Sequence, residues 1–382
     1  MLRYFQPLSY RIPYFFLLLA LPATFIAWHF YTKNQVLAIL AALFMLLFGL
    51  VDGIMLVALP RLHLSYGSLG LSWFLILITR IVLLLIVILL LAGLTRLQPA
   101  PDNLQTARLG LILWGIANLA ISTIAFYGMY IEPFDLRVTQ LKLPGPAFFS
   151  DRPLRIVQLA DLHVERLTKR EDEILARLET LQPDLIVLTG DYLNYDYARE
   201  PRAIQEARTF LSKLHAPQGM FAIPGSRFVD LPETMTEIFT GLEITVLTDQ
   251  AQALTIGKDV LYLVGVKIDR RGHDQVVLSE LMQQAPPGAY SLLLYHTPDL
   301  IETASKKGVD LYLAGHTHGG QVRFPFIGAV ITLSAYGRKY ASGFHTLGPT
   351  TLYTSRGLGM EGLHLPRARL LCPPEIVVVD IQ

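Results

Sequence analysis

The sequence predicts a chain of two parts, an N-terminal bundle of four transmembrane helices and a C-terminal α/β domain. Three observations support this prediction. Hydrophobic residues make up 52% of the 382 residues and charged residues only 16%, which is typical of a protein with a membrane portion. The long apolar runs are confined to residues 1–131. Beyond residue 154, short apolar runs alternate with amphipathic stretches, and this pattern predicts strands alternating with helices.

Four apolar segments near the N-terminus are long enough to cross a bilayer as helices, which takes about 20 residues. They cover residues 13–31, 36–59, 69–94 and 109–131. A cleaved signal peptide is the alternative for the first segment, and we favour an uncleaved helix because three further apolar segments follow it directly. We therefore predict a transmembrane anchor over 1–131, a linker over 132–153 and an α/β domain over 154–382.

Basic residues in the short loops predict the orientation in the membrane. With four spans, the N-terminus and the α/β domain lie on the same side. Basic residues on that side are Arg3, Arg11, Arg61, Arg137 and Lys142, and those on the other side are Lys33, Arg96 and Arg108. By the positive-inside rule, this difference predicts a multi-pass protein of the cytoplasmic membrane with its α/β domain in the cytoplasm. A difference of one span would reverse the orientation.

Two ionisable residues, Asp52 and Arg80, lie inside the predicted spans. Antiparallel neighbouring helices would place them at similar depth. Because unpaired charges in a bilayer are costly, we expect the two side chains to pair. This pairing has two interpretations: a structural pair that fixes the bundle, or a site for a lipid head group or an ion.

The rest of the chain begins with a proline-rich stretch that cannot be helical throughout, with prolines at 133, 144, 146 and 153. Apolar runs then predict strands at 154–160, 185–189, 219–223, 244–247, 261–266, 290–295, 310–314, 351–354 and 375–380. Amphipathic spacing predicts helices at about 168–181, 200–214, 276–284 and 299–306. The last strands have no helices between them, which indicates additional sheet pairing.

Candidate metal ligands follow several of these predicted strands. In chain order they are Asp161, His163, Asp191, His296, His316 and His318. Each taken alone is more typical of a turn, a cap or a hydrogen-bonded core histidine than of a metal ligand. For the His-x-His pair with its following glycines, a metal-site and a structural interpretation are equally good. Together they all lie at carboxyl ends of strands, where open α/β sheets build their sites. We therefore predict a metal site.

The ligand types narrow the choice of metal. Oxygen and imidazole donors without thiolate suit Mn²⁺, Fe, Zn²⁺ or Mg²⁺, and one carboxylate can bridge two ions. The single cysteine, Cys372, excludes a multi-cysteine zinc site and an intramolecular disulfide framework. A formal net charge of +1 without a basic cluster leaves no electrostatic footprint for nucleic acid.

From about residue 150 to 382 the chain resembles the calcineurin-like metallophosphoesterase superfamily. The motifs that carry the resemblance are Asp161-x-His163, Gly190-Asp191, His296 and the run Gly315–Gln321. The tail, Tyr353–Gly359 with Pro374–Ile376, is similar to the branch that often carries membrane anchors. The resemblance implies a four-layer αββα sandwich with a two-metal centre at its edge.

The resemblance also implies a role for each ligand. Asp161, His163 and His318 would hold one ion, Asp191 would bridge, and His296 with His316 would hold the second. In the family, a Gly-Asn-His box follows a strand between the Gly-Asp pair and the position of His296. Here Ser226 stands in place of its asparagine and Arg227 in place of its histidine. A hydroxyl is a poorer metal ligand than an amide oxygen, and an arginine cannot act as a general acid near neutral pH.

Three outcomes follow from this change of motif: a slower two-metal enzyme, a one-metal enzyme in which Arg227 replaces a cation, and a binding protein without turnover. A guanidinium can clamp a phosphate and stabilise its charge. The alternative for Arg227 is a surface turn residue that pairs with Asp230.

Our leading hypothesis is a membrane-anchored phosphoesterase that hydrolyses a phosphodiester, phosphomonoester or pyrophosphate with metal-activated water. Two alternatives are open for its substrate. The substrate is a lipid-linked molecule at the bilayer surface, or the anchor only localises an enzyme that acts on soluble phosphate esters. The second hypothesis is a catalytically weak metal- or phosphate-binding membrane protein, which the residues Ser226 and Arg227 favour. A transporter is disfavoured, because four spans show no inverted repeat. Metal identity and oligomeric state stay open.

Overall fold

The computed structural model describes residues 6–97, 103–149, 152–269, 272–362 and 367–382. The chain divides into two compact units. The first, which we call the helical unit, is mainly Met1–Tyr130, and the second, the α/β unit, comprises Ile131–Leu363 and Ala368–Gln382.

The helical unit consists of long apolar helices. They are α1 (Gln6–Thr32), α2 (Gln35–Arg61), α3 (Leu69–Leu97) and α4 (Asn103–Phe126). Within the described residues, three helical stretches are long and apolar enough to cross a membrane: Gln35–Arg61, Leu69–Leu90 and Leu104–Phe134. The stretch Tyr14–Phe30 is apolar but shorter. The predicted helices are thus present, and within the described residues length and composition support three of them as candidate spans.

The predicted pairing of Asp52 with Arg80 is confirmed. Both side chains are buried, and the guanidinium donates from Nε and Nη2 to the two carboxylate oxygens, each at 2.9 Å. Helix α4 completes the cluster: Asn118 accepts from Arg80 Nη1 at 2.7 Å and Ser122 from Nη2 at 2.6 Å. The charges of Asp52 and Arg80 are therefore paired inside the bundle, as an apolar solvent requires.

The first sheet of the α/β unit has six strands in the order β1-β14-β2-β3-β4-β5. Their bounds are β1 (Arg137–Leu143), β14 (Glu375–Ile381), β2 (Leu154–Leu159), β3 (Leu185–Leu188), β4 (Met220–Ala222) and β5 (Thr245–Val246). Strands β2 to β5 run parallel. Three helices cover its outer face: α5 (Lys169–Leu181), α6 (Pro201–Leu211) and α7 (Pro232–Phe239).

The second sheet has the order β12-β13-β9-β8-β7-β6. Its strands are β12 (Gly343–Leu347), β13 (Thr350–Thr354), β9 (Leu311–Ala314), β8 (Tyr290–Leu294), β7 (Asp259–Gly265) and β6 (Gln250–Ile256). The four central strands are parallel, and the two edge strands are antiparallel to their neighbours. Helices α8 (His273–Gln283) and α9 (Ile301–Lys306) cover its outer face.

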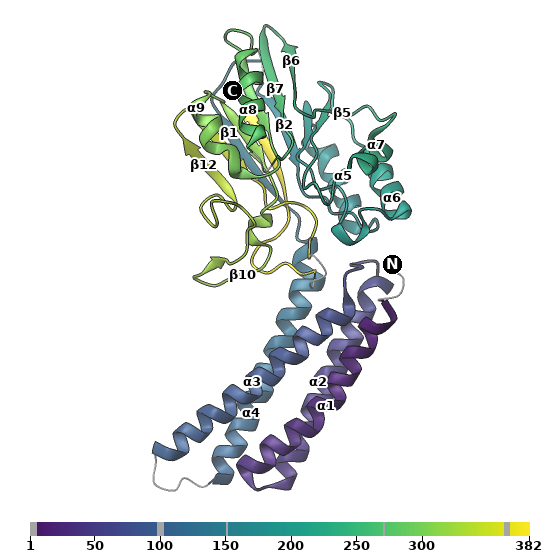
Figure 1. The fold of residues 1–382 in the computed structure, drawn as a ribbon, viewed down its shortest axis with the longest axis vertical. Coiled ribbons are helices and arrows are strands. Elements are labelled where there is room, and N and C mark those ends of the chain that lie inside the picture. The colour runs from purple at the N-terminus through teal and green to yellow at the C-terminus, as the bar shows by residue number, and fades with distance from the viewer. Residues whose placement is uncertain (1–5, 98–102, 150–151, 270–271, 363–366) are drawn as a thin grey trace. The chain divides into compact units, whose positions relative to one another are not determined.

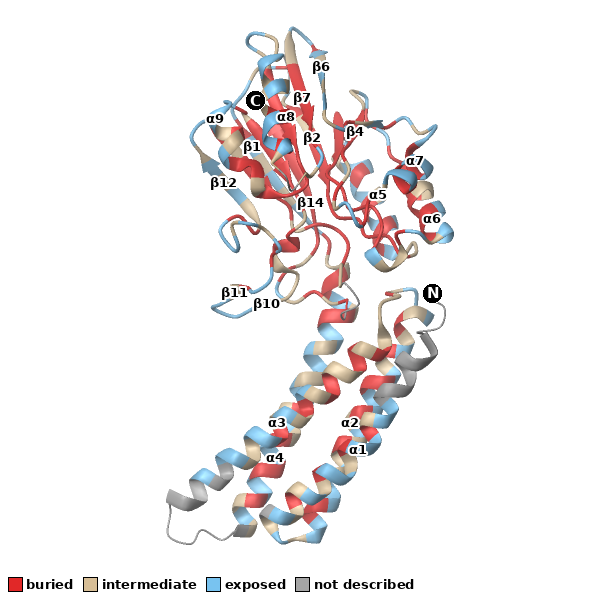
Figure 2. Ribbon diagram, viewed as in Figure 1, coloured by how far each residue is buried: buried red, intermediate tan, exposed pale blue. Residues whose placement is uncertain are grey.

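The main core lies between the two sheets. Apolar residues of the first sheet, such as Ile156 and Val187, pack against Leu263, Leu292 and Leu311 of the second. Because both faces of the central strands are covered, these strands are buried along their whole length (Figure 2). The result is the four-layer αββα sandwich expected from the resemblance (Figure 1).

Elements at the edges of the sheets differ from the sequence predictions. The segment assigned to the linker contains β1, which pairs in parallel with β14. Strands β6 and β12 and helix α7 were also not predicted. Edge strands bury one face at most, and β1 and β6 alternate exposed with half-buried residues, so they lack the continuous apolar run of a central strand.

Candidate metal centre

Loops at the carboxyl ends of parallel strands from both sheets form the candidate site. In the first sheet, Asp161 and His163 follow β2, and Asp191 follows β3. In the second sheet, His296 follows β8, and the two remaining histidines follow β9. The predicted ligands therefore come from neighbouring strand ends.

Direct hydrogen bonds join the loops of the two sheets. The amide of His316 donates to Asp161 Oδ1 at 2.8 Å. The ring of His296 lies with its Nδ1 2.7 Å from the carbonyl oxygen of Thr189. Gly315 permits this approach, because a Cβ there would lie 2.5 Å from Asp161 Oδ2. The two halves of the site are thus held in one rigid arrangement.

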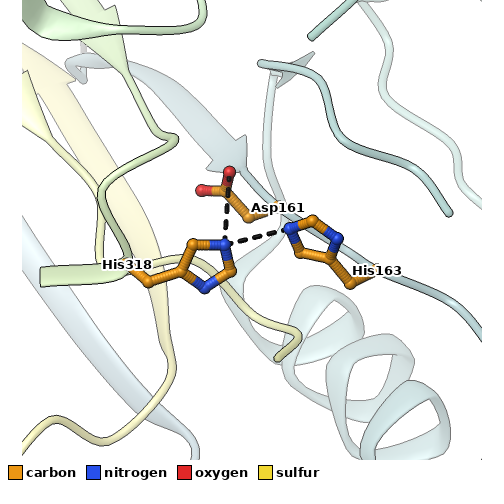
Figure 3. Close-up of side chains that lie close together, drawn as sticks. All are labelled: Asp161, His163 and His318. Atoms are coloured by element: carbon orange, nitrogen blue, oxygen red, sulfur yellow. Dashed lines mark hydrogen bonds and ion pairs between the residues drawn. The ribbon is translucent and has the colours of Figure 1, made fainter. Parts of the chain in front are cut away.

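The first group of donors is Asp161, His163 and His318 (Figure 3). The Nε2 atoms of the two histidines lie 2.9 Å apart. His318 Nε2 is 3.8 Å from Asp161 Oδ1. All three side chains are buried, and their donor atoms point toward one another.

The second group is Asp191, His296 and His316. His296 Nε2 lies 3.2 Å from both Asp191 Oδ2 and His316 Nδ1. Asp191 also approaches the first group, with its Oδ2 3.6 Å from His163 Nε2. A single carboxylate therefore lies between the two groups.

Ser226 joins the second group. Its amide donates to Asp191 Oδ1 at 2.6 Å, and its hydroxyl lies 3.2 Å from Asp191 Oδ2. The same oxygen is 3.4 Å from His296 Nε2 and from His316 Nδ1. The serine thus offers an oxygen to the second group, at the position where the resemblance implies an asparagine.

The backbone at the site is unusual. Five of the six candidate ligands have positive φ angles: Asp161 at 52°, His163 at 43°, Asp191 at 56°, His316 at 72° and His318 at 48°. Non-glycine residues seldom adopt this region, and such residues persist only where surrounding structure over-determines them. Sharp left-handed turns at the strand ends aim consecutive side chains inward.

Two acidic residues that the ligand pattern did not single out support the ligands from behind. Asp230 accepts the backbone N–H groups of Gly225, Asp191 and Tyr192, at 2.7, 2.7 and 3.0 Å. It therefore fixes the Gly190-Asp191 turn against the turn that carries Ser226. The sequence suggests Asp230 only as an alternative partner for Arg227, whereas in the structure its oxygens accept backbone N–H groups.

Glu361 lies behind the first group. Its Oε2 is 3.3 Å from His163 Nδ1, on the side of the ring away from His318. Such a partner sets the tautomer and orientation of a ligating imidazole. Glu361 lies far along the chain in a loop, and only proximity in the fold identifies it.

The C-terminal loop packs tightly on the first ligand turn. Leu358 donates to the carbonyl of Ala160 at 2.9 Å, and Gly359 to that of Asp161 at 2.6 Å. A Cβ at Gly359 would lie 2.2 Å from the carbonyl oxygen of Leu162. The buried Arg369 holds this loop by donating to the carbonyls of Gly357 and Gly359.

Burial and neighbouring charges shift the pKa values of the site imidazoles in opposite directions. Burial lowers the pKa of His296, but the adjacent Asp191 carboxylate raises it to a net value of about 10. Burial together with the neighbouring His296 lowers the pKa of His316 to about 4. Burial and His163 keep the pKa of His318 well below its usual value. Burial also raises the pKa of Asp161 to about 6.

The residues present fit divalent cations. Asp161 Oδ2 is buried and has no hydrogen-bond partner among the described residues. Imidazole nitrogens converge in pairs, His163 with His318 and His296 with His316. Carboxylate, imidazole and hydroxyl donors without thiolate suit a hard or borderline divalent ion. The buried acceptors are satisfied if cations lie between them.

Arg227 lies in the wall of a pocket of about 820 Å³ that Asp191, Ser226 and His316 also line. Its side chain is exposed, and its guanidinium lies over the ring of Phe228, 4.6 Å from the centroid. The prediction of Arg227 as a phosphate-binding group is thus compatible with its place in the pocket, and its pairing with Asp230 is wrong.

Comparisons with known proteins agree with this geometry. The family model described as calcineurin-like phosphoesterase matches residues 154–320. An uncharacterized metallophosphoesterase, YkuE of Bacillus subtilis (strain 168), is 32% identical over 271 residues, which cover 67% of this chain and 89% of the relative. The phosphodiesterase YaeI of Escherichia coli (strain K12) is 32% identical over 282 residues, which cover 69% of this chain and 95% of the relative.

A third relative has a more specific name. The UDP-2,3-diacylglucosamine pyrophosphatase LpxG of Chlamydia trachomatis (serovar D) is 27% identical over 304 residues, which cover 65% of this chain and 90% of the relative. Family match, identity and donor geometry lead to one conclusion: this chain belongs to the calcineurin-like metallophosphoesterase family of metal-dependent hydrolases.

Proposed function

We propose that the protein is a membrane-anchored phosphoesterase that uses two divalent cations to hydrolyse a lipid-linked phosphodiester or pyrophosphate. One observation carries the proposal: two groups of donors, all buried except the half-buried His316 and with Asp191 between them, lie together beside a single pocket. Two ions roughly 3.5–4 Å apart form a standard arrangement for displacement at phosphorus.

Under this proposal, Asp161, His163 and His318 would hold one ion. His296, His316 and the Ser226 hydroxyl would hold the second, and Asp191, which lies between the two groups, would contribute to both. Divalent cations held there would act as Lewis acids on a phosphoryl oxygen and supply a hydroxide nucleophile at neutral pH. Glu361 and Asp230 would keep the ligands oriented, and the rigid left-handed turns would fix their spacing.

Arg227 would bind the phosphoryl group from the pocket wall. Its guanidinium can bind two phosphoryl oxygens and stabilise negative charge. It cannot donate a proton near neutral pH, so the leaving group would receive no acid help from this position. We therefore expect good leaving groups to be favoured, such as a phosphate of a pyrophosphate or an aryl oxygen.

The preference for a lipid-linked substrate rests on two supports. The helical unit has three stretches of bilayer length, so the active site would be tethered to a membrane. The pocket wall also includes the apolar residues Phe228, Val229, Ile268, Leu300 and Leu333. The pyrophosphatase relative, whose name indicates a diacylated substrate, points in the same direction.

We further propose a multi-pass protein of the cytoplasmic membrane, with the α/β unit in the cytoplasm. This orientation rests on the basic residues of the loops, of which Arg3 lies outside the described residues. An exposed lysine of the α/β unit, such as Lys258, serves as a marker in intact cells. Two variants are compared in intact cells: one whose α/β unit has no lysine, and one in which Lys258 alone is restored to that unit. If a membrane-impermeant amine reagent labels Lys258, the α/β unit lies outside the cytoplasm and the proposed orientation is wrong.

A second candidate function is a phosphate-binding membrane protein with weak or no turnover. The exposure of Arg227 and the replacement of an amide ligand by Ser226 favour it. Purified full-length protein loaded with Mn²⁺ distinguishes the two when it is given an aryl phosphodiester and a diacylated pyrophosphate in mixed micelles. We expect turnover well above that of the Asp191→Asn variant; rates equal to that control on both substrates would favour the binding protein.

The double change Ser226→Asn with Arg227→His restores the family's box. A large gain in activity over the native chain would indicate that the native box is impaired. Unchanged or lower activity on the preferred substrate would indicate that Ser226 and Arg227 have been adapted to it.

A further inference from the structure

An exposed apolar hairpin follows the metal-binding loop directly. It spans residues 323–333 and contains the short antiparallel strands β10 (Arg323–Phe324) and β11 (Gly328–Ala329). Its large apolar residues are each at least half exposed: Phe324, Phe326, Ile327, Val330, Ile331 and Leu333. Single exposed apolar residues are ordinary, but a contiguous set of this kind marks an interaction surface.

The hairpin is an ordered element with its apolar side chains turned outward. Ala329 is buried against Gly320, where a Cβ would lie 2.4 Å from that of Ala329. The guanidinium of Arg338 donates to the carbonyl of Ile327 at 2.8 Å. At its base, the Arg323 amide donates to the carbonyl of Leu370 at 2.8 Å. The exposure of its tip therefore belongs to the folded state (Figure 2).

The hairpin is continuous with the wall of the metal-site pocket. Leu333, at its end, lines that pocket together with His316 and His318. Only four residues lie between His318 and Arg323, so the hairpin and this member of the first donor group are parts of one loop. A molecule that covers the hairpin would reach the mouth of the site.

The charged residues in the stretch of sequence that contains the hairpin are all basic, and the carboxylate of Asp299, just beyond it, accepts from Ser334 and Ala335. From residue 311 to residue 360 the sequence contains no Asp or Glu. Arg338 and Lys339 are exposed beside the hairpin, and Arg323 is half-buried at its base. Apolar residues flanked by cations complement an anionic lipid surface, where apolar side chains enter the boundary between head groups and acyl chains.

We propose that the apolar hairpin, residues 323–333, inserts into the interface of an anionic lipid bilayer and holds the mouth of the metal-site pocket at that surface. A bilayer is the occupant we choose because the same chain contains helices of membrane length. Delivery of a lipid-linked substrate rests on the function proposed above, whereas the insertion itself does not require turnover.

A fluorescence experiment tests the insertion directly. Full-length protein with Phe326→Cys is labelled with an environment-sensitive dye and reconstituted in nanodiscs of zwitterionic lipid with or without phosphatidylglycerol. The matched control is Val276→Cys, an exposed apolar position on α8. Native Cys372 is buried, and labelled wild-type protein measures its background.

We expect dye emission at position 326 to rise about threefold or more with anionic lipid, and brominated lipid to quench it, as for a side chain about 5–10 Å below the surface. Position 276 should show neither effect. Equal responses at 326 and 276 would overturn the proposal. If the dye at position 326 is protected from solvent in lipid-free detergent, and this protection increases with protein concentration, a second copy of the chain covers the hairpin. That result would also overturn the proposal.

An activity comparison separates this inference from the proposed function. The variant Phe326→Ser with Ile327→Ser is expected to raise KM at least tenfold for a diacylated pyrophosphate in anionic bilayers, with kcat/KM for a soluble aryl phosphodiester unchanged. Equal effects on both substrates would overturn the role of the hairpin. If wild type turns over neither substrate while the dye at 326 still enters the bilayer, the proposed function fails and the insertion stands.

Discussion

The Nε2 atoms of His163 and His318 lie 2.9 Å apart although 155 positions separate the two residues in the chain. Glu361 lies near the opposite nitrogen of His163, so the nitrogen facing His318 is left to share a proton or a cation. Burial and the neighbouring imidazole keep the pKa of His318 well below its usual value. A neutral imidazole there is ready to act as a ligand.

The first prediction concerns the number of bound ions. His318→Ala removes one donor from the first group and leaves the second group intact, so we expect the purified protein to lose one of two ions. Elemental analysis of metal per chain measures this result. His215→Ala, at an exposed histidine, is the control and should keep both ions. An unchanged ion count in His318→Ala would contradict the assignment of the first group.

The second prediction concerns Asp230, which orients the second group through the backbone. Asp230→Asn replaces one acceptor oxygen by an amide donor that faces backbone N–H groups. Loss of such a supporting group typically lowers metal affinity by about 10–100-fold. Competition with a chromophoric chelator measures the dissociation constants. The control is Glu233→Gln, at an exposed carboxylate on α7, which should leave the dissociation constants of both ions unchanged. Unchanged constants in Asp230→Asn would argue against a role of Asp230 in metal binding.

The third prediction separates steric from conformational effects at a glycine. Gly357 has φ +71°, and a Cβ there would lie 2.7 Å from Asp161 Cβ. Gly288 has φ +77° but nothing within 4 Å. Both Gly→Ala variants incur the backbone strain of about 1–2 kcal/mol. We expect only Gly357→Ala to add about 1–3 kcal/mol of overpacking and to reduce metal binding. Equal losses of stability, measured by denaturant unfolding, would refute the close contact.

The fourth prediction concerns the charge pair of the helical unit. Asp52→Ala leaves the buried guanidinium of Arg80 without its carboxylate, which typically costs about 3–5 kcal/mol. The double variant Asp52→Leu with Arg80→Met removes both charges and should be more stable than Asp52→Ala. Thermal unfolding in a fixed detergent compares the two. If Asp52→Ala unfolds at the wild-type temperature, the pair does not stabilise the bundle.

The fifth prediction is a pH dependence of metal binding. The pKa of His296 is about 10 because Asp191 outweighs burial, so the metal-free ring carries a proton at neutral pH. A cation must displace that proton, and the apparent affinity should therefore rise with pH, by up to about tenfold per pH unit for one proton. Calorimetry in buffers of different ionisation enthalpy counts the released protons. In His296→Asn the slope between about pH 7 and 9 should flatten, and a flat slope in wild type would contradict the prediction.

The ligand set was predictable because each member follows a buried apolar strand. Runs such as Leu185–Leu188 and Leu311–Ala314 have a clear sequence pattern, and parallel strands place their carboxyl ends at one edge. The supporting residues had no such pattern. Asp230 acts through backbone N–H groups, and Glu361 lies in a loop; neither contact depends on spacing along the chain.

Edge elements were missed for a related physical reason. Strand β1 has only one fully buried residue, and its partner, β14, lies more than two hundred residues away. The prolines on either side of this strand indicated a linker, but none of them lies inside the strand. Long-range pairing, rather than local composition, makes this segment a strand.

By itself, the sequence determined an apolar helical part, an α/β part and the identities of six candidate ligands that converge, because burial periodicity and strand-end positions are local properties. Only the tertiary structure decided that Ser226 meets the second group, that Arg227 lies over Phe228 and not against Asp230, and that residues 323–333 expose their apolar side chains. Contacts between distant loops and the accessibility of a side chain depend on the packing of the whole chain, and no local pattern encodes them.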